Sequence, residues 1–337
     1  MKKTSSFSAS LMLSLVLFAH APTCFALDMV ATIKDVKIKD RTGYVEVIKK
    51  KDNKKVSGIP GLILNDQDWI KTGDQSKVTI EFRDGSIIRL FQHTEFLIEK
   101  SKESQKGSRH FLNNFQLKLG SFWGKFTKNR QKTVIRTPTA TCGIKGTTVA
   151  FAEKAGTLDV SLSSGKVSIE NDSESIDLEP GKMAKEITRK GSIRDKISDL
   201  PYLITIKPDS SRIKIPQKGQ NVIYFTLQLV ETKTNQNYSR PGNVYISPRL
   251  DNIKFSQDIS LNSGGFARVK ATVYPFVEKN DYRDGKVEIV KEYGDGRIEI
   301  VAVMDGDNYL DTGAGHTTLI YDVPGTMRRF DYDGNIK

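Results

Sequence analysis

An acidic run near the C-terminal end is the part of this chain whose residue types come nearest to a metal site. Asp305, Asp307, Asn308 and Asp311 place oxygen-bearing side chains close together there. Alternate carboxylates at a turn suit Ca²⁺, which takes about six to eight oxygen ligands. The run departs from the EF-hand pattern, because Tyr309 occupies its fifth position and no glutamate stands at its twelfth. Asp305, Asp307 and Asp311 are therefore a weak calcium candidate, and a solvated turn rich in aspartate and glycine is the alternative.

The sequence lacks the spacings of the common catalytic and zinc sites. His93, His110 and His316 are far apart along the chain and form neither His-x-His nor His-Glu-x-x-His. No Gly-x-Ser-x-Gly nucleophile elbow is present. Abundant acidic residues would suit a carbohydrate hydrolase, but no two of them can be placed at the separation that this chemistry needs. We therefore expect no enzyme activity, no catalytic residue and no cofactor.

Cys142 is the only cysteine that remains if the chain is cut after Ala26, because the other is Cys24. The mature protein would then hold no internal disulfide, so hydrophobic burial and sheet hydrogen bonds must stabilise it. A lone cysteine within Thr-Cys-Gly-Ile-Lys-Gly is either a nucleophile or a small buried hydrophobe. We expect the second.

Basic residues form two local concentrations in a chain of formal net charge +12, or +10 once Lys2 and Lys3 are removed. The first comprises Lys49, Lys50, Lys51, Lys54 and Lys55, and the second comprises Lys125, Lys128, Arg130, Lys132 and Arg136. An exported protein rarely meets nucleic acid, so lipid headgroups, wall polymers or acidic proteins are the expected anionic partners. The alternative is a solvated basic surface. Phe122, Trp123 and Phe126 beside the second cluster could form a stacking platform, or Phe122 and Phe126 could face the core.

The N-terminus has the features of a secretory signal. Lys2 and Lys3 precede the apolar stretch Leu11 to Ala19, and Cys24-Phe25-Ala26 offers small residues before a cut after Ala26. The apolar stretch is too short to span a bilayer comfortably. An uncleaved anchor and a lipoprotein at Cys24 are the alternatives. We expect an exported protein without a transmembrane segment after cleavage, in the periplasm or on the outer cell surface.

Short runs with period 2 fill the rest of the chain and predict an all-β fold. Val78, Ile80 and Phe82 precede the turn Asp84-Gly85-Ser86, and Ile88 and Leu90 follow it. Later runs are Phe115 to Leu119, Phe122 to Phe126, Val149 to Phe151, Leu158 to Leu162 and Val167 to Ile169, with a turn predicted at Ser164-Gly165. Alternation of this kind makes one face of each strand apolar.

A change in composition divides the chain. Residues 189–201 are polar and charged, lack strand-like alternation and end in proline, so they are the predicted linker. We expect a signal peptide over residues 1–26, a β domain over 27–188, a second β domain over 202–327 and a polar tail over 328–337.

The first block resembles the FecR domain, a β-rich module of bacterial cell envelopes, over about residues 45–187. The markers are Gly61 to Leu64, Asp68-Trp69-Ile70, Thr72-Gly73, Ser76, Phe82 to Ser86, Thr94, Leu119-Gly120, Thr137-Pro138-Thr139-Ala140 and Gly143-Ile144-Lys145-Gly146-Thr147. The last of them lacks the phosphate-loop spacing, since Lys145 precedes the second glycine, so we interpret it as a packed bend rather than an anion site. The resemblance implies a solenoid-like domain of short strands and a role in binding or sensing.

Family regulators carry a cytoplasmic anti-sigma segment and a membrane helix before the FecR domain. This sequence has only the signal peptide there, so transmission of a signal to the cytoplasm is not expected of it alone. An interaction module of the envelope remains the expectation.

The second block resembles bacterial immunoglobulin-like domains more loosely. Its markers include Ser239-Arg240-Pro241-Gly242, Val244 to Ser247 and Ile300 to Gly306. About seven short strands fit an immunoglobulin-like sandwich without its disulfide and tryptophan. Such modules serve as spacers or adhesive domains.

The sequence therefore predicts a non-enzymatic envelope protein that binds another protein or an anionic envelope polymer. The second basic cluster is the predicted contact, with the first as a further candidate. A periplasmic signalling accessory that works with a separate membrane regulator is one alternative, and a structural or adhesive surface protein is another.

Overall fold

A computed structural model describes residues 30–103, 111–127, 132–256, 258–276, 278–283, 286–291, 296–306 and 309–322. Within these ranges the chain is all-β, as predicted, with one 3₁₀ turn, η1 (Arg194–Lys196), and no α-helix. None of these residues belongs to a helix that could span a bilayer. The predicted signal peptide and the polar tail lie outside the described residues.

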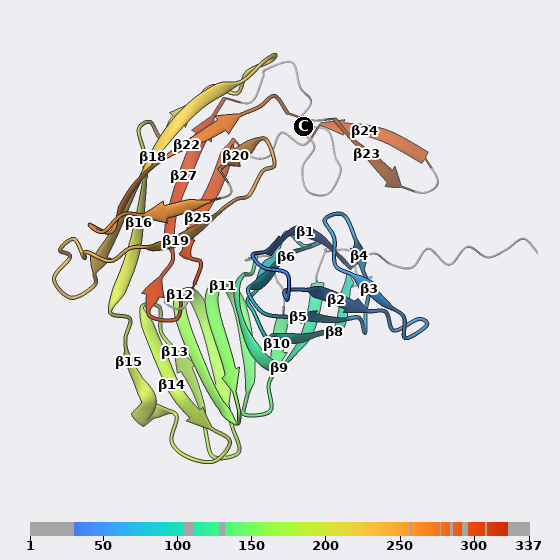
Figure 1. The fold of residues 1–337 in the computed structure, drawn as a ribbon, viewed down its shortest axis with the longest axis vertical. Helices are drawn as coiled ribbons and strands as arrows, with labels where there is room; N and C mark the ends of the chain where they lie inside the picture. Colours follow the sequence, from blue (N-terminus) through green and yellow to red (C-terminus); the bar gives the residue numbers. More distant parts are fainter. Residues whose placement is uncertain are drawn as a thin grey trace, which may run out of the picture.

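The strands form two groups, which we call the N-terminal domain (β1–β15) and the C-terminal domain (β16–β27) (Figure 1). The N-terminal strands are β1 (Ala31–Ile38), β2 (Val45–Ile48), β3 (Lys55–Ser57), β4 (Ile63–Leu64), β5 (Trp69–Thr72), β6 (Ser76–Phe82), β7 (Ile87–Leu90), β8 (Glu95–Glu103), β9 (Phe111–Lys125), β10 (Lys132–Arg136), β11 (Thr141–Lys154), β12 (Thr157–Glu170), β13 (Ser175–Leu178), β14 (Lys182–Thr188) and β15 (Ile197–Asp199).

Three long strands fold the N-terminal domain into two layers. The C-terminal half of β9 pairs with β7 and β11, whereas its N-terminal half pairs with β8 and β10. Strand β12 likewise pairs with β14 through its first half and with β13 through its second. Strands β9, β11 and β12 therefore pass from one layer to the other. Two runs that the sequence separates, 115–119 and 122–125, belong to the single strand β9, and the predicted turn Ser164-Gly165 lies within β12.

Glycines with positive φ stand where these strands change layer. The φ values of Gly120, Gly146 and Gly165 are 92°, 58° and 89°. A Cβ on Gly165 would lie 2.2 Å from the carbonyl oxygen of Gly146, so the β11 and β12 bends touch. Such close approach at positive φ is open only to glycine. The segment Gly143–Thr147 is thus a packed bend, as predicted, and the backbone of Thr147 exchanges hydrogen bonds with Phe126.

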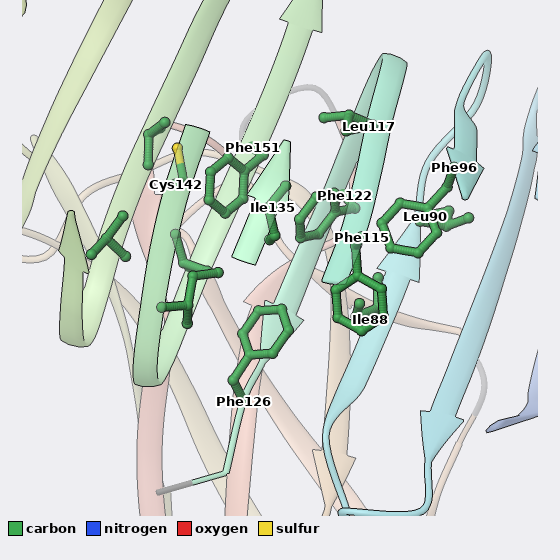
Figure 2. Close-up of a cluster of buried hydrophobic side chains, with 14 of the residues drawn as sticks. Ile88, Leu90, Phe96, Phe115, Leu117, Phe122, Phe126, Ile135, Cys142 and Phe151 are labelled. Carbon is green, nitrogen blue, oxygen red and sulfur yellow. The ribbon is translucent and has the colours of Figure 1, made fainter. Parts of the chain in front are cut away.

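Aromatic side chains fill the space between the layers (Figure 2). Phe115, Phe122 and Phe151 are fully buried, and the ring centroids of Phe122 and Phe151 lie 5.0 Å apart. Phe126 is also buried, so Phe122 and Phe126 face the core rather than a stacking platform. Cys142 packs into the same core without a disulfide, as a small hydrophobe should.

Two five-stranded sheets enclose a separate core in the C-terminal domain, in the orders β20-β22-β18-β16-β26 and β17-β27-β25-β19-β21. Its strands are β16 (Tyr202–Pro208), β17 (Arg212–Ile213), β18 (Asn221–Glu231), β19 (Gly242–Pro248), β20 (Ile253–Phe255), β21 (Ile259–Leu261), β22 (Phe266–Val273), β23 (Glu278–Arg283), β24 (Lys286–Lys291), β25 (Arg297–Met304), β26 (Thr312–Gly313) and β27 (Gly315–Tyr321).

The segment predicted as a linker is partly structured. Strand β15 pairs with β14 at the edge of the N-terminal sheet, and Leu200 is buried. Only Leu200 and Pro201 separate β15 from β16. The chain thus passes directly from one domain to the other, and the domain boundaries themselves stay a prediction.

We expect Gly165→Ala to lower the free energy of unfolding by about 2–4 kcal/mol, because the new Cβ overlaps backbone at positive φ. Gly156→Ala is the matched control, since Gly156 has a φ of 90° and a Cβ placed on it would have no other atom within 4 Å. The control should cost only about 1 kcal/mol. Equal losses in urea unfolding of both variants would contradict a role for the close approach of the two bends.

Candidate functional site

An apolar junction joins the outer face of the N-terminal domain to the C-terminal domain. Buried side chains from both domains form one cluster: Ile87, Phe91, Trp123, Ala150 and Ala152 from the first, and Val301, Val303, Leu310 and Ala314 from the second. The rings of Phe91 and Tyr309 lie 4.3 Å apart, and those of Trp123 and Tyr245 lie 6.4 Å apart edge to face. The domains are therefore packed together rather than strung on a flexible tether.

A buried ion pair lies inside this junction. Arg89 on β7 is 2 % exposed, and its Nε and Nη2 donate to Asp305 Oδ1 and Oδ2 at 3.0 and 3.2 Å. Its Nη1 donates to Thr79 Oγ1 at 2.6 Å, and its guanidinium lies 4.2 Å from the Tyr245 ring centroid. The two-pronged geometry fixes orientation as well as distance.

A second cation completes the group around Asp305. Lys77 Nζ lies 3.0 Å from Asp305 Oδ1 and donates to the Asp305 backbone carbonyl at 2.7 Å. Burial disfavours the charged carboxylate, but the Arg89 guanidinium and then the Lys77 ammonium outweigh it and hold the pKa of Asp305 below its usual value. Asp305 is thus an anion that pairs with two cations, and Asp35 Oδ2, 3.4 Å from Arg89 Nη1, supplies a second carboxylate.

Further ion pairs lie between the two domains, and in each the cation belongs to the N-terminal domain and the anion to the C-terminal domain. Lysines of the N-terminal domain face carboxylates of the C-terminal domain in the pairs Lys34–Asp251 (2.9 Å), Lys37–Asp258 (2.5 Å), Lys125–Glu299 (3.0 Å) and Lys185–Asp311 (2.7 Å). Most of these groups are partly exposed, so each pair contributes little alone. Together they make the two facing surfaces electrostatically complementary.

The three residues of the calcium candidate do not form one described site in this arrangement. Asp305 pairs with Arg89 and Lys77, Asp311 pairs with Lys185, and Asp307 lies outside the described residues. In the part of the chain that the structure describes, no group of three or more His, Cys, Asp or Glu side chains could hold a metal ion. Calcium binding stays a prediction, and it now has to compete with these ion pairs.

The second basic cluster is engaged in ion pairs where it is described. Lys125 pairs with Glu299, and Arg136 Nη1 lies 2.5 Å from Glu99 Oε2. Lys128, Arg130 and the side chain of Lys132 lie outside the described residues. Trp123 beside them is 3 % exposed and packs in the junction, so it offers no stacking surface.

The first basic cluster borders a cleft of about 390 Å³ at the opposite edge of the domain. Its lining comes from the β2–β3 hairpin and from the loop before β5: Lys49, Lys50, Lys51, Asp52, Asn65, Asp66 and Asp68. Buried Asp68 accepts hydrogen bonds from Lys49 Nζ at 2.6 Å, Lys50 N at 3.1 Å and Asn65 N at 3.0 Å. Asp68 therefore fixes the base of the hairpin and leaves its lysine tip projecting.

The lysines beyond this base are available to a partner. Within the described residues, Lys50 and Lys51 form no ion pair, and both are exposed. Lys49 is used by Asp68, and Lys55 faces Glu46 at 3.3 Å. The cleft edge thus presents unpaired positive charge on a backbone that a buried carboxylate holds in place.

Among the remaining chemical candidates in the described residues, Cys142 and Glu153 are buried. Burial and the nearby Glu153 carboxylate raise the pKa of the Cys142 thiol, which disfavours the reactive thiolate. Thr139 Oγ1 donates to Glu153 Oε1 at 2.8 Å, and burial raises the pKa of Glu153. The Thr137–Ala140 motif is therefore a turn closed over a buried carboxyl. His93 pairs with exposed Asp74, His316 lies in β27, and His110 is outside the described residues.

Sequence reasoning missed the junction and its buried Arg89. Arg89 alternates with Ile88 and Leu90, so period 2 alone puts it on the face opposite to theirs and does not say what covers that face. The missed signal is that Ile87 and Phe91 make the run apolar on both faces, as in strands buried on both sides. The run Ile300–Met304 carries the same signal in the partner sheet.

Residues 68–168 match the family model described as FecR protein, which confirms the predicted resemblance over that range. Two crystal structures, each described as a "putative anti-sigma factor" from Parabacteroides distasonis, are similar at 15 % and 14 % identity with TM-scores of 0.30 and 0.28. The similarity covers 39 % and 36 % of this chain and 57 % and 53 % of theirs, little more than half of those structures. No curated protein matches the chain.

We expect Arg89→Met to lower the free energy of unfolding by about 3–5 kcal/mol, because it leaves the Asp305 carboxylate buried with one cation instead of two. Adding Asp305→Leu should cost less than the sum of the two single changes, because the Arg89–Asp305 pair is lost only once and the one charge left without its carboxylate is the ammonium of Lys77. Lys182→Met breaks the exposed pair with Asp199 and is the control, with an expected cost under about 1 kcal/mol. Additive effects of the first two changes in a double-mutant cycle would contradict direct coupling.

The lowered pKa of Asp305 also predicts a dependence on pH. Because the folded pKa lies below the unfolded one, the stabilisation is present above the ordinary carboxyl value of about 3.9 and is lost as pH falls through the folded pKa. The stability difference between the natural chain and Asp305→Asn should therefore be constant near neutrality and shrink in acid. Urea unfolding across that range measures it, and a difference that does not change with pH would contradict the assignment.

Proposed function

We propose that this chain, which matches the FecR family over residues 68–168, is an exported, non-enzymatic binding protein of the cell envelope. Its N-terminal domain would contact an envelope component through the cleft edge around Lys50 and Lys51. The C-terminal domain would brace that domain from the other side. The observation that carries the proposal is the pair of exposed, unpaired lysines held at a fixed cleft by buried Asp68.

The packing of the two domains supports a binding role. A junction of buried apolar side chains and the Arg89–Asp305 pair holds the N-terminal domain in one orientation. Strands β2 and β3, whose hairpin carries these lysines, lie on the side of the N-terminal domain away from the sheet with β19, β25 and β27, so a partner at the hairpin leaves the junction intact (Figure 1). A preorganised surface loses less conformational entropy on binding than a mobile one.

The positions of the reactive residue types also favour binding over catalysis. Among the described residues, the core encloses Cys142 and the junction encloses Asp305, where each has a structural partner or environment. The described residues that line the cleft are lysines, aspartates and an asparagine, with no histidine or cysteine among them. This set of groups suits recognition of an anionic partner.

The FecR match favours a second candidate, a periplasmic signalling accessory that works with a separate membrane regulator. The sandwich of two sheets in the C-terminal domain would equally suit an immunoglobulin-like spacer in a structural or adhesive surface protein. Protease treatment of intact cells separates these locations, since a periplasmic protein is shielded and a surface protein is cut.

Purified protein of residues 27–337 should retain a component of envelope extract in a pull-down, and Lys50→Glu with Lys51→Glu should abolish most of that retention. Lys207→Glu with Lys270→Glu is the matched control, because both lysines are exposed on the C-terminal domain and the change in net charge is the same. Retention that both double variants weaken equally would show a general charge effect and defeat the proposed contact.

A further inference from the structure

Exposed isoleucines lie at the same edge of the N-terminal domain as the lysine cleft. Ile59 is 58 % exposed and Ile63 is 48 % exposed, on either side of a turn that contains Pro60 and Gly61. Gly61 has a φ of 86°, and its N–H donates to the backbone carbonyl of Ile33 in β1 at 2.8 Å, so the turn is held at the sheet while both isoleucine side chains face solvent. Large aliphatic side chains in such a position cost solvation free energy unless a partner covers them.

The lysines and the isoleucines are physically connected. Lys49 Nζ donates to the backbone carbonyl of Ile63 at 2.6 Å, which ties the start of the basic hairpin to the apolar strand β4. Strand β3 leads directly from Lys55 at the hairpin to Gly58 and then Ile59. Both β3 and β4 are end strands of the sheet. We call the exposed set Lys50, Lys51, Lys54, Ile59 and Ile63 the basic–apolar edge.

The chain also enters the fold at this edge. Val30 N donates to Leu64 O at 3.0 Å, and Ala31 and Thr32 of β1 pair with Leu64 and Ile63. Residues 20–29, which lie between the apolar stretch of the predicted signal and this point, reach at most about 35 Å when fully extended. Once the domain has folded, a chain that this stretch still holds at a membrane therefore keeps its basic–apolar edge within that distance of the bilayer.

We propose that the basic–apolar edge binds the surface of a bilayer that contains anionic lipid. The lysines would face the phosphate headgroups, and Ile59 and Ile63 would enter the boundary between headgroups and acyl chains. The isoleucines favour this occupant over a hydrophilic polyanion, which would need the lysines alone. The inference rests on the proposed function, because it assigns a partner to the same cleft edge.

Binding would be peripheral and reversible. Few lysines take part, and each one near an anionic surface changes the partition coefficient by about fivefold. The ionic part weakens as salt screens the surface. Insertion of the isoleucines adds a contribution that salt does not remove. Both kinds of residue are thus required, and each kind can be tested separately.

The test is co-sedimentation of residues 27–337 with vesicles of phosphatidylglycerol and phosphatidylethanolamine, compared with vesicles of phosphatidylcholine. The natural chain should bind the anionic vesicles and not the neutral ones. Lys50→Glu with Lys51→Glu should weaken binding by about 25-fold or more. Ile59→Ser with Ile63→Ser should weaken it by about tenfold or more, although the net charge is unchanged.

Controls match each change. Lys207→Glu with Lys270→Glu repeats the charge reversal, and Val222→Ser with Ile320→Ser repeats the loss of exposed aliphatic surface, both on the C-terminal domain. Both control variants should bind as the natural chain does. Thermal unfolding of every variant verifies that the fold is kept, as expected for exposed positions.

Three results would overturn the inference. Absence of binding to anionic vesicles would do so, and lysine-dependent retention of an envelope protein would then leave the proposed function standing. Loss with the lysine variant but not with the isoleucine variant would show simple polyanion binding. Equal binding by all variants would place the lipid contact elsewhere. Absence of both vesicle binding and pull-down would remove the proposed function as well.

Discussion

A buried guanidinium is the constraint on which the arrangement of the two domains depends. Arg89 lies under the junction at 2 % exposure, so it must have a carboxylate close by, and Asp305 of the other domain supplies one. If the domains separated, both Arg89 and Asp305 would be exposed to water. The aromatic contacts around Tyr245 and Trp123 stabilise many orientations, whereas the two-pronged Arg89–Asp305 contact selects one.

This junction changes the meaning of the charge distribution. Part of the positive charge is paired across the two domains, at Lys34, Lys37, Lys77 and Lys125, and the last of these belongs to the second basic cluster. Carboxylates of the C-terminal domain are the partners of these lysines. The lysines of the β2–β3 hairpin stand apart, because Asp68 accepts from the base of the hairpin and leaves Lys50 and Lys51 unpaired in the described residues. Position relative to the junction, rather than charge density along the chain, separates the two basic clusters.

The sequence predicted what alternation and turn residues control. The all-β class, the FecR resemblance, the core positions of Phe122 and Phe126 and the buried state of Cys142 all follow from local pattern. The long bent strands could not be predicted in this way, because Gly120 and Gly165 resemble ordinary turn glycines when only their neighbours in sequence are considered. The junction did not either, since the partner of Arg89 lies 216 residues away along the chain. Periodicity says which face of a strand is apolar, but it cannot say which domain will cover a polar residue on the other face.

The three strands that change layer also restrict how the N-terminal domain can assemble. Neither layer can be completed without the other, because β9, β11 and β12 each contribute half of their length to both. A chain that emerges from a translocation channel with its N-terminus first would form the early hairpins at once, yet it could not close the core until β12 had followed. Contacts of long sequence separation slow such closure. In a chain exported in this way, closure of the core would therefore be a late event, and the open sheet edges of the waiting intermediate would need protection from other chains.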